Sequence, residues 1–195
     1  MDYQKTALMV MLMMSAAVPV SAQSVGSEVQ RDINQETRIE QGLKSGELNT
    51  REAAKLERGE ARIDRMESKA LKDGTLSPEE SARIRRAQNQ ESEAIKRLKH
   101  NEAIGNPNSA SSQRMQTDVQ RNINQQTRVE QGVQSGQLTN QEVSKLERGQ
   151  ARVNRSEARA GADGHVGAHE QNRIQRRENV QSERIYNKKH NDRQR

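Results

Sequence analysis

Apolar residues recur at three- and four-residue spacing along much of the chain, with polar residues between them. In the segment 51–71 these positions are Ala53, Leu56, Ile63, Met66 and Ala70, which share one face of a helix. The segment 78–100 shows the same spacing, whereas 28–43 carries a less regular stripe. The pattern predicts helices at 28–43, 51–71 and 78–100.

The same pattern occurs twice in the chain. Residues 27–102 align without a gap to residues 117–192 at an offset of 90, and roughly half of the aligned positions are identical. A match of this kind marks a repeated folding unit. Residues 103–116 between the copies are rich in Gly, Pro, Asn and Ser, which is typical of a flexible linker. We therefore predict an all-α fold of two tandem copies of a three-helix up-down-up unit joined by that linker.

Each copy contains two glycine-centred turns between its helices: LKSGELNTRE and LKDGTLSPEE in the first, VQSGQLTNQE and GADGHVGAHE in the second. The glycines suit the left-handed residue that closes a helix. Ser77 and Glu80 have capping-box spacing, and Pro78 falls at the first helical position. Asn49 with Glu52 repeats this box. The turns are therefore predicted to be helix corners.

The turn at Gly74 also resembles the second half of an EF-hand calcium loop. Asp73 and Glu80 occupy ligand positions of such a loop, but Lys69 and Leu71 stand where its first oxygen ligands should be. The turn at Gly164 adds two histidines, which can hold a metal when they share a helix face. Weak divalent-cation binding therefore stays an alternative, with the candidate ligands Asp73, Glu80, Asp163, His165, His169 and Glu170.

The first residues differ from the rest of the chain. A lysine is followed by an apolar stretch that Pro19 interrupts and by a small-residue end at Ala22, which is typical of a secretory signal peptide at 1–22. We expect an exported protein, periplasmic or secreted, without a membrane span after cleavage. The chain has no Cys, so disulfides, thiolate nucleophiles and zinc–thiolate sites are excluded.

Hydrophobic residues make up only 30% of the chain, yet its polar residues are mostly strong helix formers. Helices with narrow apolar stripes are therefore expected, and self-association is one way to complete their burial. The predicted core consists of Leu56, Ile63, Met66, Ile84 and Leu98 in the first copy and Leu146, Val153, Ile174 and Ile185 in the second.

The third helix of each copy is rich in Arg and Lys, within a chain of 33 basic and 27 acidic residues. Basic helices attract polyanions, so an anionic cell-surface polymer is a candidate partner. Nucleic acid is disfavoured because Tyr186 is the one aromatic residue after the predicted cleavage site. The sequence contains no catalytic motif and implies no cofactor beyond a weakly bound cation. The leading interpretation is a non-enzymatic exported interaction protein.

The repeated segment RIEQGLKSGELNTREAAKLERGEARIDRMESKA and the Asp-Gly turn that follows it resemble a group of small exported proteobacterial proteins of unknown function. Those proteins carry SGxLTxxE and ADGxxTxxE turns in repeated helix-turn-helix units. The resemblance covers both copies and implies an export address and a lineage, but no mechanism.

Overall fold

The computed structural model describes residues 20–193 and confirms the all-α class, since this range contains helices and turns but no strand. Its α-helices are α1 (Val20–Ser45), α2 (Thr50–Ala70), α3 (Pro78–Lys99), α4 (Ala110–Gln134), α5 (Asn140–Ala160) and α6 (Ala168–Lys189). Short 3₁₀ turns, Leu71–Asp73 and Gly161–Asp163, follow α2 and α5.

Helix ends follow the sequence prediction closely, with two exceptions. Helix α1 begins at Val20, and α4 begins at Ala110, inside the segment 103–116 that was expected to be a linker. The N-cap of α4 is Ser109, whose side chain accepts a hydrogen bond from the Ser112 amide. Most of the predicted signal peptide falls on residues 1–19, which lie outside the described residues.

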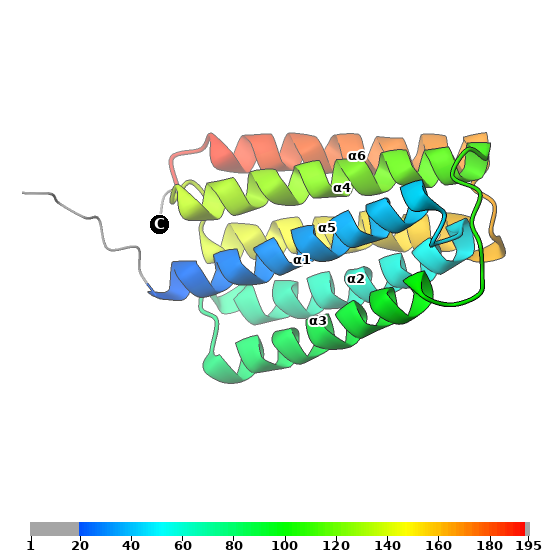
Figure 1. The fold of residues 1–195 in the computed structure, drawn as a ribbon. Coiled ribbons are helices and arrows are strands. Elements are labelled where there is room, and N and C mark those ends of the chain that lie inside the picture. The colour runs from blue at the N-terminus through cyan, green and yellow to red at the C-terminus, as the bar shows by residue number, and fades with distance from the viewer. Residues whose placement is uncertain (1–19, 194–195) are drawn as a thin grey trace, which may run out of the picture.

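The two halves of the chain pack against each other lengthwise. Helix α1 lies beside α4 and α2 beside α5, with α3 and α6 on opposite flanks (Figure 1). The pairs are antiparallel: Ser144 near the start of α5 donates to the Ser68 carbonyl near the end of α2 at 2.6 Å. At the other end Arg51 Nη2 donates to the Asp163 carbonyl at 2.7 Å. Contacts between the halves therefore run along the whole bundle.

The narrow apolar stripes are buried mainly where the halves meet. One core cluster joins Leu43, Leu48 and Leu56 with Met115 and Ile174, and a second joins first-half valines with Leu138 and Leu146. Of the predicted core, Met66 and Leu98 are half-buried, and the buried residues are Leu56, Ile63, Ile84, Leu146, Val153, Ile174 and Ile185.

The corners have the predicted cap chemistry. Gly46, Gly74, Gly136 and Gly164 have φ values of 80°, 95°, 75° and 91°, which favour glycine. Complete capping boxes start α2, α3 and α5, from Asn49, Ser77 and Thr139 respectively. At α6 only the Glu170 half of the box is present, because the N-cap residue Gly167 has no side chain.

Charge is divided between the inside and the outside of the bundle. Among the described residues 15 Asp or Glu side chains are buried, whereas no Lys or Arg is. The outward positions of α2 and α5 form a surface that we call the basic face: Arg51, Lys55, Arg58, Arg62, Arg65, Lys69, Lys145, Arg148, Arg152, Arg155 and Arg159. The net charge of +6 therefore understates how basic the exterior is.

The described residues 20–193 contain six α-helices. None of the helices there combines enough length with enough apolar character to span a bilayer.

Candidate functional site

The carboxylates predicted as EF-hand ligands take part in turn and cap hydrogen bonds. Asp73 Oδ1 accepts from the amide and hydroxyl of Thr75 at 2.9 and 3.0 Å, and these bonds hold the pKa of this exposed group below its usual value. Glu80 Oε2 accepts from the amide and hydroxyl of Ser77 at 3.1 and 2.8 Å. The corner interpretation thus accounts for both carboxylates.

The fourth turn is built in the same way. Asp163 Oδ1 accepts from the His165 amide, and Glu170 Oε2 accepts from the Gly167 amide, both at 2.9 Å. His165 and His169 are exposed. Within residues 20–193 the one group of three acidic or histidine side chains with metal-ligand spacing contains none of the six predicted ligands.

The interior of the bundle instead contains a cluster of carboxyl groups that sequence reasoning missed. They come from the facing sides of α1, α2 and α5, and each is at most 2% exposed. We call this cluster the carboxylate core: Asp32, Glu36, Glu57, Glu60, Asp64, Glu67, Glu147 and Glu157. The acids on α2 are spaced by three, four and three residues, so they share one helix face.

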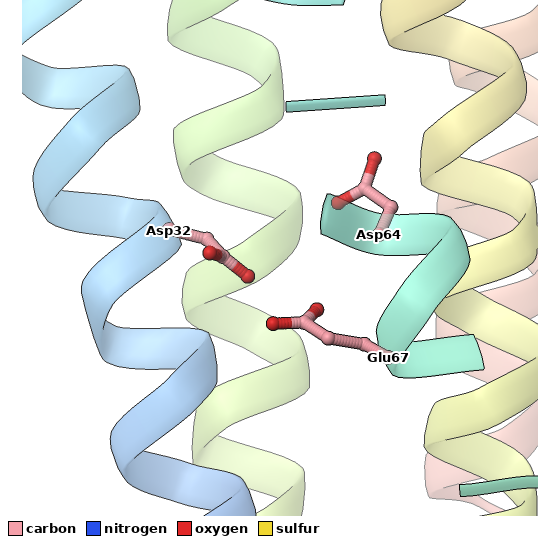
Figure 2. A group of neighbouring side chains, drawn as sticks. All are labelled: Asp32, Asp64 and Glu67. Carbon is pink, nitrogen blue, oxygen red and sulfur yellow. The ribbon is translucent and has the colours of Figure 1, made fainter. Parts of the chain in front are cut away.

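Asp32, Asp64 and Glu67 form the tightest group within this core. Figure 2 shows Asp32 reaching from α1 and Glu67 from α2 into the space between these helices, with Asp64 one turn away. One carboxylate oxygen from each residue lies within 4.8 Å of the other two. Oxygens that bind one Ca²⁺ at 2.3–2.6 Å can be up to about 5 Å apart, so the spacing suits a shared cation of this size.

Few hydrogen-bond donors reach these carboxyl groups. Gln88 Nε2 donates to Asp32 Oδ1 at 2.8 Å, and Asn154 Nδ2 donates to Asp64 Oδ2 at 3.2 Å. Within the described residues no amide or hydroxyl group donates to either oxygen of Glu57 or Glu60, and Glu57 is paired only with the carboxyl groups of Glu36 and Glu157. A buried acceptor without a donor costs about 1–3 kcal/mol, and more when it carries charge. When its carboxyl groups are ionised, the core is therefore electrostatically incomplete with protein groups alone.

Burial raises the pKa of every member of the carboxylate core. The pKa of Asp32 rises to about 7, and those of Glu36, Glu147 and Glu157 rise to about 8. Glu57, Glu60, Asp64 and Glu67 have pKa values well above their usual range, because burial is reinforced by repulsion from neighbouring carboxylates. Near neutral pH the core must either hold protons or face a cation.

The two halves of the chain carry different residue types at corresponding positions of the core. Ninety residues after Asp32, Glu36, Glu60 and Asp64 stand the amides Asn122, Gln126, Gln150 and Asn154. These amides form a bonded network, in which Gln150 Nε2 donates to Asn122 Oδ1 at 2.8 Å and Asn122 Nδ2 donates to Glu157 Oε2 at 2.9 Å. The second half thus satisfies positions that the first half leaves as carboxyl groups.

Comparisons with known proteins do not add to this picture: no family model matches the chain, and no curated protein or solved structure matches it.

Proposed function

We propose that the protein binds hard multivalent cations of about the size of Ca²⁺ in its carboxylate core. The observation that carries the proposal is the group of Asp32, Asp64 and Glu67, whose ligand oxygens lie within 4.8 Å of one another in the interior of the bundle. Glu60, whose two oxygens accept no hydrogen bond, belongs to the same core, and its pKa is raised by burial and then by repulsion from Glu36 and Asp32.

The chemistry of the donor set favours hard cations. Carboxylate and amide oxygens are preferred by Ca²⁺, Mg²⁺ and Mn²⁺, whereas Cu⁺ and Zn²⁺ favour sulfur or imidazole. The chain has no Cys, and its four His residues are exposed. Mg²⁺ binds oxygen at about 2.0–2.1 Å and keeps most of its bound water. A buried core whose ligand oxygens are more widely separated therefore suits Ca²⁺ better.

The proposed cation site lies in the interior of the bundle and not at the turns that the sequence suggested. The two sequence copies are proposed to be three-helix units. The first copy supplies most of the cation ligands, and the second supplies amides at the corresponding positions. The protein is proposed to be exported and non-enzymatic, as the leading segment and the absence of catalytic motifs suggest. Cation binding then replaces protons in the core and stabilises the closed bundle.

Calorimetry with Ca²⁺ near pH 7.5 tests the proposal. The variant Asp32→Asn/Asp64→Asn carries the residues of the second copy at both positions, so it removes charge with little change of shape. We expect binding by the wild type and at least a roughly tenfold loss in this variant, because two of three charged ligands are gone. The matched control His165→Ala/His169→Ala is expected to bind like the wild type.

Two results would contradict the proposal. One is undiminished binding by the Asp32→Asn/Asp64→Asn variant, and the other is loss of binding in the histidine control. The same titration near pH 4.5 should give much weaker binding, because protons then compete for every carboxylate of the core.

A further inference from the structure

A groove lined by arginines runs between α5 and α6. It consists of two adjoining cavities of about 200 and 390 Å³ that share Arg173 and Arg177. Both helices contribute cations to the walls of what we call the arginine groove: Arg152, Arg159, Arg173, Arg176, Arg177 and Arg184. Its α5 wall is also part of the basic face.

The charges of the groove are not neutralised by the protein. All six arginines are exposed, and none takes part in the ion pairs found within residues 20–193. Glu170 is the one acid in the lining, and its Oε2 accepts from the Gly167 amide at 2.9 Å. The groove therefore concentrates positive charge between low-dielectric walls, which strengthens attraction of an anion.

Arginine side chains repel one another on the outer side of α5. The pKa of Arg155, which is half-buried on α5 and does not line the groove, is lowered by partial loss of hydration and by repulsion from Arg65, Arg159 and Arg152. Arg152 and Arg159 do line the groove, so an anion bound there would relieve their share of that repulsion.

The groove belongs to one half of the chain only. At the first-half positions that correspond to Arg177, Val180 and Arg184 stand Ala87, Gln90 and Ala94. Val180 is 46% exposed and lies on the groove floor. Each helix has four arginines, but arginines at 177 and 184 and the valine at 180 distinguish α6 from α3 at the groove positions.

We propose that the arginine groove binds a linear phosphate polymer lengthwise. Arginine, the sole cationic residue type in the lining, presents a planar fork of donors that matches phosphate oxygens. The α6 arginines lie within the 12 residues 173–184, or about 16 Å of helix from the first to the last, so several phosphates bind at once. This site is independent of the carboxylate core and involves α5 with α6, rather than the third helix of each copy.

The shape and composition of the groove favour this occupant over two other polyanions. A flat membrane surface reaches the rims of a groove but not its interior, and the groove lining contains no aromatic anchor for the lipid interface. Single-stranded nucleic acid gains much of its affinity from stacking on aromatic side chains, which the groove lacks.

Fluorescence anisotropy of labelled inorganic polyphosphate with the full chain, in roughly physiological salt, tests the proposal. The groove variant is Arg173→Gln/Arg177→Gln/Arg184→Gln. The control Arg83→Gln/Arg86→Gln/Arg97→Gln removes three exposed charges from α3, so both variants have the same net charge. Circular dichroism verifies that each variant retains the helical fold.

We expect the groove variant to lose at least about tenfold in affinity and the control less than about threefold, with binding that weakens steeply as salt rises. Equal losses in the two variants would overturn the proposal, because they indicate an unspecific charge effect. Absent binding in roughly physiological salt, or tighter binding of anionic phospholipid vesicles, polyglutamate or single-stranded DNA than of polyphosphate, would also overturn it.

Discussion

Replacing Asp32 by Asn gives a direct measure of how much a buried carboxylate costs the fold. Burial raises the pKa of Asp32 from 3.8 to about 7. Between these values the folded protein holds a proton that the unfolded chain has lost. The stability contributed by this group is therefore complete below about pH 4 and falls as pH rises toward 7.

The size of the stability change follows from the shift in the pKa of Asp32. A rise from 3.8 to about 7 corresponds to about 4 kcal/mol of stability lost across this pH range. Relaxation and water entry reduce such values in real proteins, so we expect Asp32→Asn to stabilise the cation-free protein by about 1–4 kcal/mol near pH 7.5. Near pH 4 the difference should be small, because Asn resembles the protonated acid and keeps an acceptor for Gln88 Nε2.

Urea unfolding followed by circular dichroism, with a chelator present, measures both effects. The wild type should be more stable near pH 4.5 than near pH 7.5, and Asp32→Asn should flatten part of that dependence. Asn122 occupies the corresponding position in the second half, so the substitution introduces a side chain that the fold already accommodates there. A wild type that gains stability with rising pH, together with a destabilised variant, would show that burial does not raise the pKa of Asp32.

Further predictions concern the cation, a cap and the contact between the halves. Added Ca²⁺ should raise the melting temperature near pH 7.5 but not near pH 4.5, where the core is protonated; equal shifts in differential scanning calorimetry would count against the site. Ser77→Ala should cost about 1 kcal/mol in urea unfolding because α3 loses its N-cap, and an unchanged midpoint would argue against the capping box. Gly161→Ala places a Cβ 2.7 Å from Met115 Cε and 2.8 Å from Ala54 Cβ, so it should cost about 1–3 kcal/mol; a neutral substitution would show that the halves are less closely packed.

Local sequence rules predicted most of the helical framework. Capping boxes and left-handed glycines act within a few residues, so Ser77 with Glu80 and the turn at Gly74 could be recognised directly. How the halves pack could not be derived, because narrow stripes of small apolar residues fit several partners. Gly161, directly after α5, packs close to Ala54 of α2, and these positions are more than 100 residues apart in the chain.

The carboxylate core was missed because charged residues are ordinarily assigned to the surface. A signal was nevertheless present in α2. Its acids Glu57, Glu60, Asp64 and Glu67 share the face of Ile63, whereas every Arg and Lys of that helix lies on the opposite side. The acids of α2 lie on its apolar face and its basic residues lie on the opposite face. This separation of charges by sign is a pattern that indicates buried acids. The candidate ligands at the turns were chosen by their resemblance to a loop, which carries no information on burial.

Locating a bound ion in a crystal would give direct evidence for or against cation binding in the carboxylate core. Anomalous scattering from crystals grown with Mn²⁺ or with Tb³⁺, which replaces Ca²⁺, would identify the ion independently of any change in stability. We predict a peak bound by carboxylate oxygens of Asp32, Asp64 and Glu67, at about 2.1–2.6 Å. Peaks only at the turns of Asp73 or Asp163, with none inside the bundle, would contradict it.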